Sequence, residues 1–549
     1  FTALKNLIDD TYTEYISVPI CLKHIYALGV LSTIDHYVAQ YEREHNSILL
    51  SKTPDILSGL INENDTPFIY EKVGTRIEHY MIDEFQDTSN MQWRNFEPLV
   101  SESLARNNEN LIVGDVKQSI YRWRNSDWRL LHEELDKRFA CHEINPGRDT
   151  NWRSCAHVVA FNNTFFKRAA MLMHSSVESQ LKEHAISDVN PIIKEVFENV
   201  AQNVSSKHSE RSGRIAVNIL TVKNAGEYEE HILQRLPEMI RSLMSKGYRQ
   251  KDIAFLVRTR AEGRKIVELL LALSAESEDA LSELRVVSDE SLLISNAPPV
   301  KLIVGILRYL QNPSYPINEL ILAYEYGLMN SLHDSDTTPS QVLARYFQSR
   351  SLEHSIEPEL HDFIEEIASK PLFEMCECII HKFRMHQNAA HVAYIEAFQD
   401  LVVEYCQTHS ADLYSFLRWW SEKESSAAVK LPENLDAITV MTIHKSKGLE
   451  FHTVFLPFCD WKLENERSSY IWCTPPEAPF DELQLLPITY GPTMNESIYQ
   501  QDYKKEKLQL WVDNLNLLYV AFTRPKCNLV VWCKENNKNT ISELLASAI

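Results

Sequence analysis

The sequence predicts an α/β fold in which parallel sheets carry helical insertion domains. Short apolar runs alternate with helix-spaced segments between residues 80 and 130, and this alternation returns between residues 213 and 273. The block from about 298 to 431 then shows helical spacing almost throughout, after which strand-like segments resume. Strand–helix alternation of this size is typical of parallel sheets. A helical block between two stretches of it indicates an inserted domain.

The length and composition are those of a multi-domain globular protein. A chain of 549 residues is too long for one hydrophobic core, and 44% hydrophobic with 24% charged residues is ordinary. Ten cysteines are scattered along the chain, which favours a reducing, cytoplasmic location. We find no apolar stretch of bilayer length and no signal peptide, so we expect no membrane partner.

Changes of pattern divide the chain into five segments. We expect helices at 1–72, part of a first sheet domain at 73–150, the first part of a second sheet domain at 151–297, a helical insertion at 298–432 and the rest of the second sheet domain at 433–549. The acidic run 275–290 is predicted to be a solvated linker or the rim of the insertion. The proline-rich run 475–492 is predicted to be irregular.

The clearest chemistry lies at residues 79–88, where a short apolar run ends in Asp83 and Glu84. Parallel strands deliver side chains to their carboxyl ends, where open α/β sheets bind ligands. An Asp there can hold Mg²⁺ on a triphosphate, and a neighbouring Glu can orient or deprotonate the attacking water. For two adjacent acids alone, a strand running into a solvated turn would be the better interpretation.

A basic and aromatic segment follows the next predicted strand, 111–115. Tyr121 and Trp123 lie among four basic residues, Lys117, Arg122, Arg124 and Arg129. Basic side chains neutralise phosphates, and an aromatic face can stack on a base of single-stranded nucleic acid. A charged loop beside a core tryptophan explains the local pattern equally well. The net charge of −21 argues against a nucleic-acid partner, but the placement of the basic residues matters more than the total.

Three later segments carry further candidate residues. Arg153 follows Asn151-Trp152 at the entry of a helix, where a guanidinium can grip a phosphate with two hydrogen bonds. Lys445 and Lys447 flank a serine after the strand predicted at 437–443, a plausible phosphate contact. An amphipathic helix at 503–523 is expected to stop at Arg524, because the proline that follows disfavours helical geometry in the residue before it.

Taken in this order, the segments resemble the signature motifs of the UvrD/Rep-type superfamily 1 DNA helicases, closest to the AddA/RecB branch. Residues 82–88 match the second motif, 113–124 the third, 151–154 the fourth, 442–451 the fifth and 518–524 the sixth. The resemblance implies two RecA-like parallel sheets of the P-loop NTPase type. Residues 1–72 would then be a helical remnant of an insertion in the first lobe.

The resemblance also implies a role for each position. ATP and Mg²⁺ would bind with Asp83 on the metal and Glu84 as the catalytic base. Gln118 would sense the γ-phosphate, Trp152 would stack on adenine, Arg153 and Arg524 would act as arginine fingers, and Glu450 with Gly448 would contact the nucleotide. Single-stranded DNA would touch Tyr121, Trp123, Arg124, Thr442, His444 and Lys445.

The implied function is an ATP-dependent 3′–5′ DNA helicase or translocase in double-strand-break repair and recombination. It would act on single-stranded DNA and duplex ends, with an AddB-like or RecC-like partner subunit. The family's P-loop ends in Gly-Lys-Thr or Gly-Lys-Ser, yet Gly-Lys occurs nowhere here, and the chain begins at Phe1. We therefore expect an N-terminally truncated piece with little ATPase activity. No carboxylate–lysine cluster follows the sixth motif, so we expect no nuclease activity from this piece.

The alternative is a non-hydrolysing, DNA-binding scaffold subunit with a helicase fold. A site that has lost catalysis does not require the two acids, the glutamine and both arginines together. This sequence has all of them: Asp83, Glu84, Gln118, Arg153 and Arg524. An RNA-directed helicase stays open, because stacking and phosphate contacts do not read the sugar.

Overall fold

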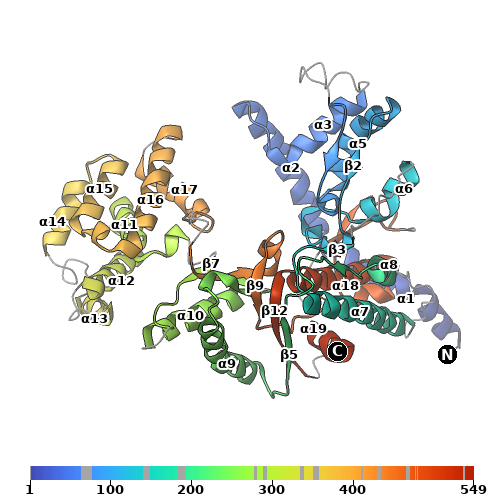
Figure 1. The fold of residues 1–549 in the computed structure, drawn as a ribbon. Helices are drawn as coiled ribbons and strands as arrows, with labels where there is room; N and C mark the ends of the chain where they lie inside the picture. The colour runs from blue at the N-terminus through green and yellow to red at the C-terminus, as the bar shows by residue number, and fades with distance from the viewer. Residues whose placement is uncertain are drawn as a thin grey trace. The chain divides into compact units, whose positions relative to one another are not determined.

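The computed structural model describes residues 2–63, 77–139, 149–182, 192–276, 281–288, 293–333, 339–349, 358–409, 412–429, 435–464, 470–476, 478, 480–535 and 538–549. The chain divides into two compact units. Unit 1 comprises Phe1–Met239, Asp252–Thr259 and Thr442–Ile549, and unit 2 comprises Ile240–Lys251 and Arg260–Met441. Both contain parallel strands together with helices, which confirms the predicted α/β class (Figure 1).

The N-terminal segment of unit 1 is helical over residues 2–63, and residues 1 and 64–72 of the segment predicted as helical lie outside the described residues. It forms α1 (Thr2–Leu22), α2 (Ile25–His45), η1 (Leu50–Lys52) and α3 (Thr53–Glu63). Contrary to expectation, the stretch Thr11–His45 is long and apolar enough to cross a membrane by length and composition. Core helices of soluble proteins and signal sequences meet the same criterion, so no membrane role follows from it.

A small parallel sheet carries the acidic turn. β1 (Met81–Ile82) pairs with β2 (Leu111–Ile112), and η2 (Phe85–Asp87) follows β1 directly. α5 (Asn90–Ala105) begins with a capping box in which Ser89 and Gln92 satisfy each other's backbone N–H groups. The segment then continues through η3 (Val116–Gln118), η4 (Arg122–Arg124), the π-helix η5 (Leu130–Glu134) and α6 (Leu135–Arg138). The acids thus lie where the sequence placed them, at the carboxyl end of a parallel strand.

The larger sheet of unit 1 is also parallel. Its strands run in the order β5 (Arg214–Leu220), β12 (Pro525–Lys534), β9 (Phe451–Leu456) and β6 (Ile253–Val257). Every residue of β6 is buried, as expected for a parallel strand covered on both faces. β12 lies between β5 and β9, so it is an interior strand of this sheet.

Helices and short elements complete unit 1. They are β3 (Thr150–Asn151) paired with β4 (Asn203–Val204), α7 (Ala156–Lys182), α8 (Ile192–Glu198), η9 (Ile443–Ser446), η10 (Pro492–Glu496), α18 (Gln500–Phe522) and α19 (Ile541–Ala548). The run 475–492 is not wholly irregular, because β11 (Leu486–Thr489) pairs antiparallel with β10 (Tyr470–Cys473). Residues 477 and 479 of that run lie outside the described residues.

Unit 2 is dominated by helices. Its helices are α10 (Arg260–Glu276), α11 (Pro298–Gln311), α12 (Pro316–His333), α13 (Pro339–Ser349), α14 (Pro358–Ile367), α15 (Leu372–Lys382), α16 (Ala389–Thr408) and α17 (Leu413–Lys423), with short turns η6 (Gln250–Asp252), η7 (Ile294–Asn296) and η8 (Met385–Gln387). Aromatic residues of this block, such as Phe398, Phe416 and Trp420, fill its own core. α9 (Ala225–Ser245) continues from unit 1 into unit 2 along the chain.

One short strand corrects the sequence analysis of unit 2. β7 (Val286–Ser288), inside the predicted linker, pairs in parallel with β8 (Ile438–Thr442). A three-residue strand has too few apolar positions to show alternation, and its partner lies far along the chain. Residues 277–280 and 289–290 of the predicted linker lie outside the described residues.

Candidate nucleotide and nucleic-acid site

The acidic pair lies on a strained turn. Glu84 has φ 52° and ψ 37°, in the left-handed region that side chains other than glycine, Asn and Asp rarely adopt. Its backbone N–H donates to Asp83 Oδ1 at 2.8 Å, and Phe85 N donates to Val113 O at 3.0 Å. Both carboxylates are exposed. Strain of this kind is found at functional sites, where the surrounding structure holds an unfavourable backbone in place.

A buried glutamine fixes Glu84 against the end of β2. Gln86 Nε2 donates to Glu84 Oε2 at 2.5 Å, while Gln86 Oε1 accepts from Asp115 N at 2.9 Å. Gly114 permits this close approach, because a Cβ at that position would lie 2.7 Å from Gln86 Oε1. The amide of Gln86 therefore ties the two strand ends together through a single side chain.

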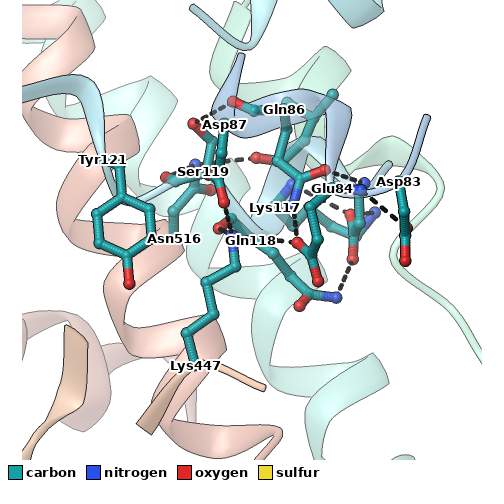
Figure 2. A network of polar contacts seen from close by, with 12 residues as sticks. Asp83, Glu84, Gln86, Asp87, Lys117, Gln118, Ser119, Tyr121, Lys447 and Asn516 are labelled. Atoms are coloured by element: carbon teal, nitrogen blue, oxygen red, sulfur yellow. Dashed lines mark hydrogen bonds and ion pairs between the residues drawn. The ribbon is translucent and has the colours of Figure 1, made fainter. Parts of the chain in front are cut away.

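Asp115 organises the segment after β2. Its carboxylate accepts a hydrogen bond from Gln118 Nε2 at 3.1 Å and lies 2.7 Å from Lys117 Nζ. Gln118, the predicted phosphate sensor, is thereby held beside the acids (Figure 2). The structure brings Gln118 together with Glu84 and Asp83 in one polar network.

Lys447 enters this network from the residue after η9. Its Nζ lies 2.5 Å from Asp87 Oδ2 and 3.3 Å from Glu84 Oε2, and it donates to Gln118 O at 2.9 Å (Figure 2). An ammonium has three N–H donors, so these acceptors satisfy it, and its side chain is only 7% exposed. Burial raises the pKa of Asp87, although Lys447 partly offsets that rise.

From the sequence, Lys447 was expected only to contact a phosphate and was not among the predicted site residues. The signal that was available is Gly448, which follows it with φ 83°. A glycine in the left-handed region lets the backbone turn sharply. Such a turn directly after a lysine indicates that the backbone bends to place the long side chain, but the sequence could not name its partner.

The two arginines lie at the end of α18. Arg153 Nε contacts Glu450 Oε2 at 3.2 Å, and its Nη1 donates to Thr523 O at 3.1 Å. The pKa of Glu450 is lowered by the Lys526 ammonium at 2.7 Å and by Arg153. Glu450 and Arg153 are therefore held as a charged pair.

Arg524, which the resemblance implied to be an arginine finger, is buried inside the protein. α18 ends at Phe522, before the proline that follows Arg524, as predicted, but Arg524 is only 1% exposed. Its Nε donates to Val520 O at 2.8 Å and its Nη1 to Leu449 O at 3.1 Å. Burial and the neighbouring Arg153 lower its pKa to about 10, while Glu84 acts in the opposite direction. Arg524 therefore stays charged at neutral pH and lies within electrostatic range of the acidic turn.

An exposed indole accompanies this cluster. Trp152 precedes Arg153 and is 67% exposed. An exposed aromatic face beside a guanidinium offers a flat apolar surface for a planar ring. The structure thus gathers Trp152, Arg153, Glu450 and Gly448 around the turn between β3 and α7 and the start of β9.

A second group of aromatic residues surrounds η4. Tyr121 OH donates to His444 O at 3.1 Å, and the Arg124 guanidinium lies 4.6 Å from the ring centre of Trp123 and 5.4 Å from that of Tyr121. Trp123 is 66% exposed. Lys447 Nζ lies 5.4 Å from the Tyr121 ring centre, so Tyr121 belongs to both groups. Aromatic faces with a stacked arginine form a sequence-tolerant platform for unpaired bases.

The η9 segment supplies the remaining predicted strand contacts. Thr442 ends β8, Lys445 is exposed, and His444 lines a cavity of about 430 Å³. The other lining residues are Ile120, Arg122, Trp123, Arg258, Leu510, Asp513, Asn514 and Leu517. Burial and Arg258 lower the pKa of His444 to about 4, so this imidazole is neutral at physiological pH.

Comparison with known families agrees with this arrangement. The family model described as the UvrD/REP helicase N-terminal domain matches residues 29–139, and the UvrD-like helicase C-terminal domain matches residues 339–536. This chain belongs to the UvrD-like helicases. The two matches include the segments that carry the acids, the η4 aromatics, η9 and Arg524.

Curated relatives of this UvrD-like chain agree with the AddA/RecB branch. It is 27% identical over 476 residues to an ATP-dependent helicase/nuclease subunit of Lactococcus lactis, covering 77% of this chain and 37% of that protein. The Clostridium botulinum protein of the same name is 24% identical over 546 residues, 88% of this chain and 42% of that protein. Exonuclease/helicase subunit RexA of Streptococcus pneumoniae is 24% identical over 530 residues, which are 84% of this chain and 40% of that protein. The chain thus spans about two-fifths of the length of these relatives.

The oxygen donors of this UvrD-like chain fit a magnesium ion. Mg²⁺ is usually held by one or two carboxylates, phosphates of the substrate and water, not by a dedicated protein cage. Asp83 and Glu84 are adjacent, exposed carboxylates at a strand end. Within the described part of the chain, no cluster of three or more His, Cys, Asp or Glu side chains forms a ready-made metal cage. The donor set therefore suits Mg²⁺ that arrives with a triphosphate.

Proposed function

We propose that this chain is the motor part of an ATP-dependent DNA helicase or translocase of the AddA/RecB type, acting in double-strand-break repair and recombination. The observation that carries the proposal is that Tyr121 contacts both the acidic turn, through Lys447, and the η9 segment. Its ring lies beside Lys447, which holds the acidic turn, and its hydroxyl binds the η9 segment. Nucleotide and strand residues are therefore joined through direct contacts.

We assign the nucleotide roles to the acidic turn and the cations around it. Asp83 would bind Mg²⁺, Gln118 would contact the terminal phosphate, and Glu84 would orient the attacking water and take its proton, while Lys447 holds the acidic turn. When bound, Mg²⁺–ATP supplies the phosphoryl group that passes to water. The hydrogen bond from Gln86 holds the Glu84 carboxylate in place. Arg153 and Arg524 would stabilise negative charge that develops on the phosphate oxygens.

We assign the strand roles to the η4 and η9 segments. Trp123 and Tyr121 stack on bases, and Arg124, Thr442, His444 and Lys445 contact the backbone of single-stranded DNA. Trp152 stacks on adenine, with Glu450 and Gly448 beside the nucleotide. Movement is 3′ to 5′, and duplex ends with an AddB-like or RecC-like partner are the natural setting of the longer protein.

We also propose that the five sequence segments are functional parts. Residues 1–72 and 73–150 belong to the first lobe, and residues 151–297 and 433–549 form the second. Residues 298–432 are the helical insertion. This division is supported by the helices of the insertion, which fill a core of their own.

The test is binding of single-stranded DNA to the 549-residue chain. We expect a fluorescent dT₂₀ oligonucleotide to bind, as measured by anisotropy, more tightly than a blunt duplex of equal length. Equal binding of an RNA oligonucleotide would favour an RNA-directed enzyme. Absence of dT₂₀ binding across a range of salt concentrations would overturn the proposal.

The scaffold alternative makes a different prediction in the longer protein. A motor requires the Glu84 carboxylate, so Glu84→Gln in the full-length protein should abolish ATP-dependent unwinding while single-strand binding persists. A scaffold would show no unwinding before the change. The strained backbone of Glu84 and its fixed carboxylate favour the motor.

A further inference from the structure

One face of α18 is polar although the helix is buried. Glu506, Gln509, Asp513 and Asn516 are spaced by three, four and three residues, which places them in one row along a helix. This row meets the segment that follows β2. Asn516 Nδ2 donates to Val116 O at 3.1 Å and to Ser119 O at 3.0 Å.

Arg122 binds the other members of the row. Its Nη1 and Nη2 each donate to a Glu506 oxygen at 2.9 Å, and its Nε donates to Asp513 Oδ2 at 2.5 Å. Nη1 also donates to Gln509 Oε1 at 3.3 Å. These contacts occupy four of the five N–H donors of the guanidinium. The paired hydrogen bonds to Glu506 fix its orientation, as bidentate arginine–carboxylate pairs do.

The electrostatics keep this set charged at neutral pH. Burial lowers the pKa of Arg122, but Asp513 and Glu506 outweigh burial and hold it above its ordinary value. All three side chains are less than a third exposed. A guanidinium whose donors are taken by protein carboxylates has little left to offer a phosphate.

Arg122 lies in the chain directly between two aromatic residues, so its contacts affect where those rings point. It lies between Tyr121 and Trp123, the two rings that the proposed function assigns to the strand. The turn they share, η4, is a single 3₁₀ turn that ends at Asn125 with φ 65°. A turn this short has few hydrogen bonds of its own. The orientation of both rings therefore depends on the contacts of Arg122 with Glu506 and Asp513.

We propose that Arg122, Glu506 and Asp513 form a clamp that positions Tyr121 and Trp123 for single-stranded DNA without touching the strand. This inference rests on the proposed function. It assigns Arg122, which the sequence placed among phosphate-binding cations, to positioning. It also joins the strand platform to the helix that ends at Arg524, eleven residues beyond Asp513 and about 16 Å along the axis.

Asp513→Asn separates the clamp from a simple charge effect, because the two predict opposite changes in DNA affinity. Removing a carboxylate near a strand should tighten DNA binding if only charge matters. The clamp requires the carboxylate, so we expect dT₂₀ binding about 5-fold weaker. Asp502→Asn removes the same charge from the first turn of α18 and should leave affinity unchanged or slightly higher. Tighter or unchanged binding of Asp513→Asn would overturn the clamp.

Salt dependence separates positioning from phosphate contact at Arg122. A lost phosphate contact lowers the slope of log affinity against log salt by about 0.7 for single strands. The clamp predicts weaker binding of Arg122→Gln with an unchanged slope. It also predicts that Arg122→Lys fails to restore affinity, because an ammonium cannot reproduce the fork. A reduced slope, or full rescue by lysine, would contradict it.

The pH profile supplies an independent readout. Asp513 faces Arg122, its neighbour Glu506, and Arg258 and His444 across the cavity, and burial raises its pKa to about 6. His444 stays neutral above pH 5. dT₂₀ affinity of the wild-type chain should therefore fall between pH 7.5 and 5.5, and Asp513→Asn should lose that fall. The same profile in both proteins would count against the clamp.

Controls keep the outcomes distinct. If the wild-type chain does not bind dT₂₀, the proposed function fails, whereas normal wild-type binding with unaffected variants removes the clamp alone. Should Asp513→Asn prove unfolded by circular dichroism, Glu506→Gln applies the same test from the other carboxylate. In the Arg122→Gln background, Asp513→Asn should have no further effect on affinity. Additive losses would show that the two residues act separately.

Discussion

Lys447 shows how much can depend on one side chain. Its ammonium neutralises Asp87 and Glu84 at once and lies beside the Tyr121 ring. Asp87 Oδ1 is buried without a hydrogen-bond partner, so this carboxylate relies on Lys447 for compensation. A buried carboxylate with one strong partner is a sensitive point of the fold.

Lys447→Met should therefore destabilise unit 1. Removing one member of a buried ion pair typically costs about 3–5 kcal/mol, and we expect about 3 kcal/mol because Asp87 retains some exposure. Urea unfolding at pH 7.5 measures the change. Asp87→Asn in the same chain should restore part of the loss, because the unpaired charge is then gone.

The control for Lys447 is Lys137, whose exposed partner Glu133 lies 4.0 Å away. Lys137→Met should change the free energy of unfolding by less than about 0.5 kcal/mol, since exposed pairs contribute little. Equal losses for the two lysines would contradict the importance assigned to the acidic turn.

Trp123→Ala tests the strand platform directly. Stacking of a base on an aromatic side chain contributes about 1–3 kcal/mol, so dT₂₀ affinity should fall roughly 5- to 150-fold. Trp472, a tryptophan of β10 that is also more than half exposed, is the matched control, and Trp472→Ala should leave affinity unchanged. A similar loss for both would point to nonspecific apolar binding.

The positions of individual residues were predictable where an ordered motif contains them. Asp83, Glu84 and Gln118 were predictable because strand ends and motif order fix their place. The partners of Lys447 and Arg122 were not, because each reaches residues more than three hundred positions away along the chain. Long, flexible side chains hide their contacts from any local pattern.

At the scale of elements, the turn between β1 and η2 depends on a glycine opposite it. A Cβ on Gly114 would lie 2.7 Å from both Gln86 Oε1 and Leu131 Cδ2, and Gln86 is buried. Gly114→Ala should cost about 1–3 kcal/mol in the free energy of unfolding, as overpacking usually does. It should also disturb Glu84, since Gln86 holds that carboxylate.

Gly29, within α2, gives the opposite expectation. An added Cβ there meets nothing within 4 Å, and alanine favours helix over glycine by about 1 kcal/mol. Gly29→Ala should therefore be neutral or stabilising in urea unfolding. Destabilisation of similar size at both glycines would refute the role given to Gln86.

Acid titration of stability tests the burial of Asp513. Its pKa is raised from an ordinary 3.8 to about 6, so the folded state holds this proton more tightly than the unfolded chain does. Protonation of Asp513 therefore adds most to the free energy of unfolding below pH 3.8. That addition is lost as the pH rises through about 6. Asp513→Asn should remove that part of the pH dependence of urea unfolding, and an unaltered slope would contradict it.

Elements were predictable where periodicity was strong. The alternation of strands and helices predicted between residues 213 and 273 is found as β5, α9, β6 and α10. α18 was expected to be amphipathic, yet it is buried on nearly every side, because its polar row meets protein in place of water. β7 and β11 were missed since short strands depend on partners elsewhere in the chain.

For the whole molecule, the distribution of charge is compatible with the DNA binding that we propose for this acidic chain. The net charge is −21, but the candidate strand surface brings Arg124 and Lys445 to the exposed side of η4 and η9. Several acidic residues are internally paired instead, as Glu506 and Asp513 are with Arg122. Local cation placement, and not the total, decides binding.

ATP turnover is the prediction that belongs to the whole chain. Its 549 residues contain no Gly-Lys dipeptide, so no P-loop lysine is present to neutralise the β- and γ-phosphates. We expect turnover near background in a coupled assay, with or without dT₂₀. Turnover that rises on adding the oligonucleotide would show that other cations, such as Lys447, suffice.

The buried guanidinium of Arg524 has a consequence for any motor cycle. Its donors already close the last turn of its own helix through Val520 and hold the chain before β9 through Leu449. Any phosphate that draws this guanidinium out of its place must do so against these two hydrogen bonds. If Arg524 serves the nucleotide as we propose, its movement would loosen the last turn of α18, the same helix whose Glu506 and Asp513 bind Arg122.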